Sequence, residues 1–169
     1  MVEVSMNELG FVIMAVVGAL AICFVTHQAE RRRSNAIRAI ANRAGFHYIG
    51  EALPRSLTLH GTLFERASKV WNVIDGEPRG IRIIAFDCRV GVGKYSWKRT
   101  IIAIESDAEF SSAVAFNPEM TVEFVGRWKI LYRSKATIEF RISGLMPIEQ
   151  LEAHLNSIAA PSSRQPLLT

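Results

Sequence analysis

The chain has 169 residues, of which 49% are hydrophobic and 21% are charged, and its formal net charge is +4. This length allows one domain of ordinary size with an appended segment, and it excludes a multidomain enzyme. Two cysteines are too few for a disulfide-rich secreted scaffold, and the apolar content is too high for a disordered chain.

The first predicted element is an uncharged apolar run over residues 9–25, LGFVIMAVVGALAICFV. A helix of this length rises about 25 Å, and residues 26–28 extend it toward the ~30 Å hydrocarbon core. The run has no polar stripe, whereas a core helix of a soluble protein would need one on the face toward solvent. The preceding residues contain Glu3 and Glu8 but no base, and Ile22 is too bulky for a lipoprotein box before Cys23. We therefore predict an uncleaved transmembrane helix at residues 9–28.

The charge distribution predicts the orientation of this helix. All 20 Lys and Arg residues follow the span, and the first of them are Arg31, Arg32, Arg33 and Arg38. The positive-inside rule then places residues 1–8 outside and the domain in the cytoplasm, as a single-pass protein of the inner membrane. Arginines beside anionic headgroups are stabilised by about 1 kcal/mol each. We expect these four to contact anionic lipid, so that the basic charge needs no nucleic acid.

Small residues within the span share one helical face, at Ala15, Gly18 and Ala19. Such a face lets another helix approach closely, although Gly and Ala are also common in membrane helices generally. His27 stands at the interface, where a histidine can ligate the metal of a haem or chlorin; a single one at a helix end is usually just a polar interfacial residue.

Residues 29–45 are expected to form a basic juxtamembrane helix that ends at Gly45. Its apolar residues recur at helical spacing, at Ile37, Ile40, Ala41 and Ala44. The arginines occupy the remaining faces. We expect this helix to continue or kink from the span and to act as a lipid-facing stem close to the bilayer.

Beyond this helix the hydrophobic pattern changes to the alternation of β-strands. Strands are predicted at 46–49, 69–75, 81–90, 97–105, 121–125, 128–133 and 137–142. The turn at 76–80 predicts a hairpin, Pro147 predicts the start of a final helix, and residues 161–169 predict a flexible tail. The sum is an α+β domain over residues 46–160, an antiparallel sheet of about five to seven strands with flanking helices.

The loop Gly91-Val92-Gly93-Lys94 resembles a phosphate loop only superficially, because Tyr95 and then a strand follow the lysine. The surrounding segment is basic and aromatic, with Arg89, Lys94, Tyr95, Trp97, Lys98 and Arg99. Such a cluster can stack on nucleic acid, touch a bilayer or dock a partner. Membrane tethering favours the last two, and a solvated hairpin tip is the remaining interpretation. We expect Trp71 in the core and Trp97 exposed.

Residues able to carry chemistry are scattered. His47, His60, His154 and Cys88 do not have the spacing of metal ligands, so we expect neither a metal nor a cofactor. Asp87, on a half-buried strand, could serve as an acid or base, although such an aspartate more often pairs with an arginine or caps a turn. We therefore expect no enzymatic activity, and an enzyme using Asp87 or Cys88 is the least favoured hypothesis.

Residues 64–100 carry a set of short motifs: Asn72-Val73-Ile74-Asp75-Gly76, Phe86-Asp87 and Gly91-Val92-Gly93-Lys94. This pattern resembles a group of bacterial single-pass membrane-anchored proteins of unknown function, which share N-V-[IL]-x-G, F-D and G-x-G-K motifs. The chain departs from the pattern at Cys88, where these proteins often carry tyrosine. The resemblance implies a similar fold and membrane anchoring, and no activity.

Two functional hypotheses follow. The first is a non-catalytic accessory or structural subunit that binds other membrane-protein subunits and stabilises a larger inner-membrane complex, such as a respiratory or photosynthetic one. The second is a solitary membrane-tethered module that binds a ligand or a protein in the cytoplasm. They differ in whether the small-residue face of the span is buried against other chains.

Overall fold

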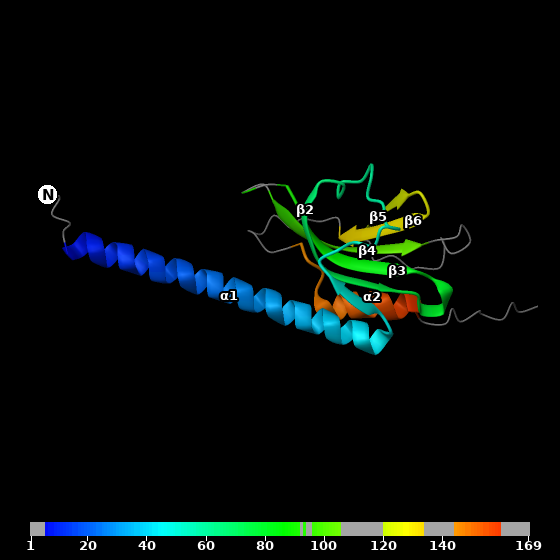
Figure 1. Ribbon diagram of the computed structural model, residues 1–169, viewed down its shortest axis with the longest axis horizontal. Coiled ribbons are helices and arrows are strands. Elements are labelled where there is room, and N and C mark those ends of the chain that lie inside the picture. The colour runs from blue at the N-terminus through cyan, green and yellow to red at the C-terminus, as the bar shows by residue number, and fades with distance from the viewer. Residues whose placement is uncertain (1–5, 92, 94–95, 106–119, 134–143, 160–169) are drawn as a thin grey trace, which may run out of the picture. The chain divides into compact units, whose positions relative to one another are not determined.

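The computed structural model describes residues 6–91, 93, 96–105, 120–133 and 144–159. The chain divides into two compact units, Met1–Ala36 and Ile37–Thr169. One helix, α1 (Met6–Ala44), runs through the boundary between them (Figure 1). Each unit is described separately below.

The first unit consists of the N-terminal part of α1. From Gly10 onward this helix is long and apolar enough to cross a membrane, and none of its most apolar stretch is buried, which distinguishes it from the core helix of a soluble protein. The Thr26 hydroxyl donates to the carbonyl oxygens of Ile22 (3.0 Å) and Cys23 (2.9 Å), so the helix backbone satisfies this polar group. The chain thus carries a candidate membrane anchor where the sequence predicts one.

The second unit contains a six-stranded antiparallel sheet with the strand order β1-β2-β3-β4-β6-β5 (Figure 1). Its strands are β1 (His47–Gly50), β2 (Ala67–Gly76), β3 (Ile83–Val90), β4 (Trp97–Glu105), β5 (Met120–Val125) and β6 (Trp128–Arg133). A short 3₁₀ turn, η1 (Pro78–Gly80), links β2 to β3, and the helix α2 (Ile148–Ala159) follows the sheet. The predicted α+β class is confirmed. The predicted strand at 137–142 and the tail at 161–169 lie outside the described residues.

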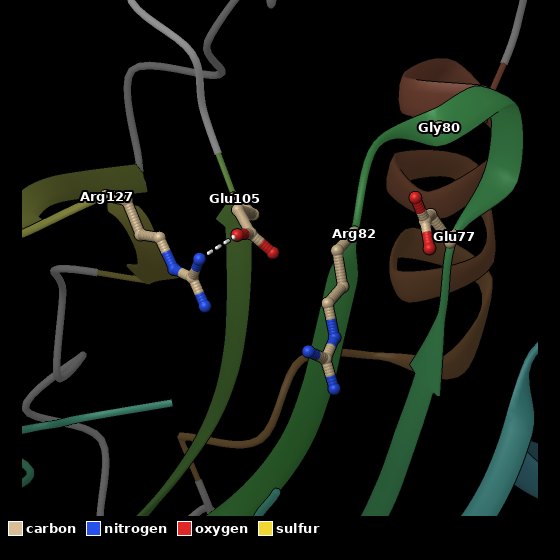
Figure 2. A pocket seen from close by; sticks show the side chains of 5 residues that line it. All are labelled: Glu77, Gly80, Arg82, Glu105 and Arg127. Carbon is tan, nitrogen blue, oxygen red and sulfur yellow. Dashed lines mark ion pairs between the residues drawn. The ribbon is translucent and has the colours of Figure 1, made fainter. Parts of the chain in front are cut away.

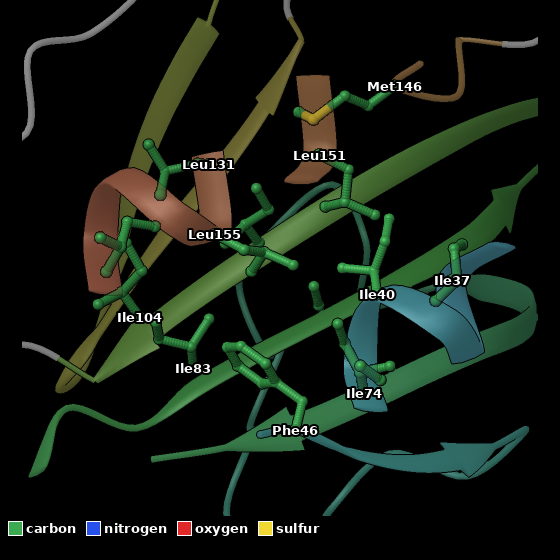
Figure 3. Close-up of a cluster of buried hydrophobic side chains, with 14 residues drawn as sticks. Ile37, Ile40, Phe46, Ile74, Ile83, Ile104, Leu131, Met146, Leu151 and Leu155 are labelled. Atoms are coloured by element: carbon green, nitrogen blue, oxygen red, sulfur yellow. The ribbon is translucent and has the colours of Figure 1, made fainter. Parts of the chain in front are cut away.

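One face of the sheet is covered by helices. The apolar cluster there combines β-strand residues such as Ile83 and Ile104 with Leu151 and Leu155 of α2 (Figure 3). Alternation along the strands places every second residue on this face. We call it the helix-side face.

The opposite face is covered by residues 51–66, which form neither a helix nor a strand. Leu57 and Phe64 of this segment pack on Phe86, Ile101 and other apolar residues of the sheet. The Trp128 indole N–H donates to the Ser56 carbonyl oxygen at 3.1 Å and fixes the segment at its middle. We call residues 51–66 the strap.

The last two turns of α1 belong to the second unit. Ile37, Ile40 and Ala41 are buried in the helix-side cluster, and Ala44 packs against it. The sequence pattern predicts a lipid-facing stem over residues 29–45, and for these two turns the structure differs. The reason is that the stripe at i, i+3, i+4 and i+7 is the interface of the helix with the sheet.

Candidate functional site

The buried polar centre of the domain is the carboxylate of Asp87, which is fully buried on β3. The Asn72 amide donates to one carboxylate oxygen at 2.8 Å, and the Thr100 hydroxyl donates to the other at 2.7 Å. The Tyr48 hydroxyl donates to the Asn72 amide oxygen at 3.2 Å, and the Met146 backbone N–H donates to the Thr100 hydroxyl at 2.9 Å. This network ties β1, β2, β3 and β4 to the segment that precedes α2.

A β-bulge positions Asn72 in this network. Trp71 pairs with Asp87 and Ile74 pairs with Ala85, so two residues of β2 stand opposite one of β3. Asn72 has φ +55° within the bulge, a left-handed conformation that asparagine tolerates better than most side chains. Its amide therefore lies on the helix-side face, beside Asp87.

Two of the three motifs that carry the resemblance meet in this part of the structure. Asn72 and Asp87, from two separate motifs, are hydrogen-bonded to each other. Gly76 lies against the Phe46 ring, which a side chain at position 76 would strike at 2.5 Å. In these motifs, Asn72 stands in the β-bulge, Asp87 is at the centre of the hydrogen-bond network, and Gly76 allows close packing of the Phe46 ring. Sequence reasoning missed Tyr48 and Thr100, whose only signal is a polar residue at an inward position of a strand.

Asp87 is poorly placed for acid–base chemistry. Its two carboxylate oxygens accept hydrogen bonds from side chains, and the residue has no accessible surface. A catalytic carboxylate must come within hydrogen-bond reach of a substrate. The geometry assigns Asp87 the role of joining strands.

Cys88 is buried on the strap-side face of the same strand. Burial, with a smaller contribution from the Asp87 charge, raises the pKa of the Cys88 thiol to about 12. The thiolate is the reactive form of cysteine. At neutral pH this thiol therefore stays protonated and acts as a small apolar side chain.

The predicted basic and aromatic hairpin cluster is divided by the strand alternation. Arg89 and Lys98 pair across β3 and β4 and lie on the helix-side face, whereas Trp97 and Arg99 lie on the strap side. Lys94 and Tyr95 lie outside the described residues. The four described residues do not form one contiguous patch, because neighbours in a strand point to opposite faces.

Trp97 is half-buried, in contrast to the exposed position expected from sequence, while Trp71 is buried as expected. The Trp97 ring meets the Phe64 ring edge-on, with centroids 6.0 Å apart. The Arg99 guanidinium lies 4.8 Å from the Trp97 centroid and donates to the Lys98 carbonyl oxygen. Burial lowers the pKa of Arg99. These contacts make Trp97 and Arg99 part of the packing beneath the strap.

Comparison with protein-family models, with curated proteins and with solved structures finds no match. The functional argument therefore rests on the geometry of the chain itself.

An open cavity of about 320 Å³ lies at the η1 end of the sheet, lined by Glu77, Gly80, Arg82, Glu105 and Arg127 (Figure 2). Its two arginines are already paired. Arg82 donates to both oxygens of Asp75, at 3.1 and 2.8 Å, and Arg127 lies 2.8 Å from a Glu105 oxygen. The Asp75 hydrogen bond raises the pKa of Arg82. This balance of charges suits a solvated ion-pair cluster rather than an anion site.

Within the described ranges, no three His, Cys, Asp or Glu side chains come close enough together to hold a metal ion. His60 instead contacts Glu65 of the same strap at 2.8 Å. His47 is exposed on β1, and His154 is half-buried on α2, where burial lowers its pKa.

The residues predicted for membrane contact all lie on α1. Ala15, Gly18 and Ala19 are exposed, as are Arg31 and Arg32. A side chain added at Gly18 would meet nothing within 4 Å.

The last two predicted lipid-contacting arginines have other neighbours. Arg33 is half-buried, and its side chain or backbone already interacts with another group of the chain. Arg38 is exposed, and its guanidinium lies 4.7 Å from the Tyr48 ring centroid. Arg38 therefore connects the helix to the Asp87 network through Tyr48.

Proposed function

We propose that this chain is a non-catalytic single-pass subunit that stabilises a larger inner-membrane assembly through its transmembrane helix and its cytoplasmic domain. The observation that carries the proposal is the contrast between two apolar surfaces. The helix exposes its apolar side chains, including Phe11 at 78% and Ile22 at 67%. The domain, in contrast, closes both faces of its sheet with its own helices and strap.

The small-residue face indicates which surface of α1 contacts a partner. Ala15, Gly18 and Ala19 are exposed on one side of α1, and a face of small residues allows the backbone of a second helix to come close. In a bilayer, lipid tails can cover Phe11 or Ile22, but only another helix gains from the close approach that Gly18 permits. The partners proposed are therefore transmembrane helices of other subunits.

A non-catalytic role agrees with the chemistry of the domain. Asp87 is buried in a network, the thiol of Cys88 is protonated, and the arginines of the open cavity are paired with carboxylates. The orientation, with the N-terminus outside and the domain in the cytoplasm, rests on the arginines that follow the span. An energy-converting host, respiratory or photosynthetic, and membership of the anchored group that the motifs resemble remain predictions.

The test is extraction of native membranes in a mild detergent, followed by native gel electrophoresis and mass spectrometry of the band that contains the chain. We expect the chain to migrate in stoichiometric amounts with a larger assembly, whose subunits the mass spectra identify. Migration alone at 18.8 kDa plus the detergent micelle would contradict the proposal.

A pair of variants tests the helix face itself. Gly18→Leu fills the proposed contact surface. Ala21→Leu lies roughly 110° from the centre of the face formed by Ala15, Gly18 and Ala19, at about 100° per residue, and does not fill that face. Both variants keep the span apolar and capable of insertion. We expect Gly18→Leu to lose co-migration with the assembly and Ala21→Leu to keep it. Equal behaviour of the two variants would contradict the assignment of this face.

The alternative function is a solitary membrane-tethered binding module. A specific observation favours it: Lys69, Arg89 and Lys98 of the domain share one face of the sheet. The native-gel experiment separates the two functions, because a solitary module migrates without other subunits.

A further inference from the structure

The strand register collects three basic residues that are distant in sequence. Lys69 of β2 pairs with Arg89 of β3, and Arg89 pairs with Lys98 of β4. Directly opposed side chains have Cβ atoms about 4.5–5.5 Å apart, and like charges in such positions repel each other. All three lie on the helix-side face, because Arg89 alternates with Ala85 and Asp87, and Lys98 with Thr100 and Ile102. We call these three residues the basic row.

The ring of Trp71 lies within reach of this row. The ammonium groups of Lys69 and Lys98 are each 5.7 Å from the Trp71 ring centroid. Trp71 is only 8% exposed, yet it belongs to neither apolar cluster of the sheet. An indole with cations beside it is typical of side chains at a membrane–water interface, where an apolar ring and a charged group are both satisfied.

The nearest acid, Asp87, supplies one negative charge beside the three positive charges of the row. It is next to Arg89 on the same face, and its carboxylate accepts hydrogen bonds from Asn72 and Thr100. Among the residues that the structure describes, neither the Lys69 ammonium nor the Arg89 guanidinium forms an ion pair. Lys69 is exposed and Arg89 half-buried, so positive potential extends from this row into solvent.

The row stands at the end of the sheet where the chain enters the domain. Arg38, in the first turn of the domain, lies over the Tyr48 ring. The Tyr48 hydroxyl is hydrogen-bonded to Asn72, and Asn72 is hydrogen-bonded to Asp87. Asp87 is two residues before Arg89 on the same strand. In Figure 3, Ile37 lies toward the arrowhead of β3, and Ile83 marks its opposite end. Arg38 therefore adds a fourth positive charge at this end.

The tether between anchor and domain is short. Eight residues separate Gln28 from Ile37, and a connection of this length spans at most about 30 Å even when fully extended. Whatever the orientation of the two units, an inserted helix keeps the domain within reach of the bilayer surface. A surface near a bilayer meets headgroups at high local concentration.

We propose that the basic row, Lys69, Arg89 and Lys98, with the Trp71 ring beside it, is a docking surface for anionic phospholipid headgroups. The headgroup phosphates relieve the repulsion between the three cations, because a basic side chain near an anionic lipid surface is stabilised by it. This docking holds the domain against the membrane. It does not rest on the proposed function, because a subunit and a solitary module would dock in the same way.

The test places the full chain in nanodiscs of two compositions, zwitterionic phosphatidylcholine alone and phosphatidylcholine mixed with phosphatidylglycerol. Labelling by an amine-reactive reagent, quantified by mass spectrometry against a lysine-containing peptide added to every sample, reports the accessibility of Lys69. Buried Lys129 should stay unlabelled while the domain is folded. We expect Lys69 to react severalfold more slowly in the anionic discs. High salt should restore the rate, because the screening length falls from about 10 Å at 0.1 M to about 3 Å at 1 M.

Arg89→Glu tests the row without a loss of folding. The new carboxylate would stand between Lys69 and Lys98, where opposite charges stabilise a cross-strand pair. We expect this variant to fold and to label Lys69 equally in both discs. The matched control, Arg55→Glu, makes the same charge change at an exposed position of the strap and should keep the protection.

Two outcomes would overturn the proposal. One is equal labelling of Lys69 in the two discs by the unmodified chain. The other is protection by millimolar inorganic phosphate in zwitterionic discs to the level of the anionic discs, which would identify the ligand as a soluble anion rather than a lipid.

Discussion

The guanidinium of Arg99 occupies the space beside Gly144 that the Cβ of any other residue would fill. The two residues form a parallel β-bridge, which attaches the segment before α2 to the β4 strand. The Trp97 ring lies against the same guanidinium. A buried cation is thus held by an aromatic ring and by a backbone that lacks a side chain.

Gly144→Ala should lower the free energy of unfolding by about 1–3 kcal/mol, because the added methyl group overlaps Arg99 and forces it to move. Denaturant unfolding in detergent, followed by tryptophan fluorescence, measures the change. The double variant Gly144→Ala/Arg99→Ala should be more stable than the sum of the two single effects implies, since the overlap with Arg99 is then absent and only the approach to the Lys98 carbonyl oxygen, at 2.8 Å, remains. A wild-type unfolding midpoint for Gly144→Ala would contradict this placement of Arg99.

Thr100→Val tests the Asp87 network. Valine has nearly the same shape as threonine but removes the hydroxyl that donates to Asp87 and accepts from the Met146 N–H. Leaving such buried groups without this partner costs roughly 1–3 kcal/mol each, so we expect clear destabilisation in the same unfolding assay. Thr100→Ser keeps the hydroxyl and should retain most of the stability. An equal loss of stability in the serine and valine variants would contradict the proposed contribution of the hydroxyl hydrogen bonds.

Ile40→Ala tests whether the last turns of α1 belong to the domain. Ile40 is 2% exposed against the sheet, and truncating a buried isoleucine costs about 2–5 kcal/mol. Asn42→Ala changes an exposed position of the same turn and should shift stability by no more than about 0.5 kcal/mol. Proteolysis or unfolding of the domain reports both. A lipid-facing stem would instead show no difference between the two variants.

Stability should fall at alkaline pH. Burial, and then the 2.5 Å hydrogen bond to Glu123, raise the pKa of Tyr132 from 10.0 to about 12, and burial raises the pKa of Cys88 from 9.0 to about 12. In the unfolded chain both groups ionise at their ordinary values, so between pH 9 and 12 the unfolded state binds fewer protons than the folded state. Their contribution is complete below pH 9 and declines as the pH rises toward 12.

The slope of unfolding midpoint against pH measures this effect. Tyr132→Phe removes one of the two groups and should flatten the slope above pH 10 whatever its effect at neutral pH. A variant slope identical to that of the unmodified chain would contradict the assignment.

Much of the fold could be predicted because its signals are local. The hairpin between β2 and β3 follows from strand alternation on both sides of a Gly- and Pro-containing turn, and α2 begins one residue after Pro147. The burial of Ile37 and Ile40 against the sheet does not follow from local signals. Their spacing predicts a helix with an apolar stripe, but a stripe of this kind can face lipid or a sheet, and only the neighbouring elements decide which.

The candidate sites depend on pairing between strands. In sequence, Trp97, Lys98 and Arg99 form one basic and aromatic cluster with Arg89, but the alternation of β4 sends Trp97 and Arg99 to one face and Lys98 to the other. Lys69 was not a candidate at all, since it stands 20 residues before Arg89 and joins it only through the register of β2 and β3.

The sequence by itself determined the apolar span, the basic segment that follows it and the order of strands and helices, because each depends on residues close together in the chain. The tertiary structure decided that Asn72 meets Asp87, that Gly144 makes room for Arg99 and that three distant cations share one row. These contacts depend on a bulge and on cross-strand register, and a shift of one residue would turn each side chain to the opposite face.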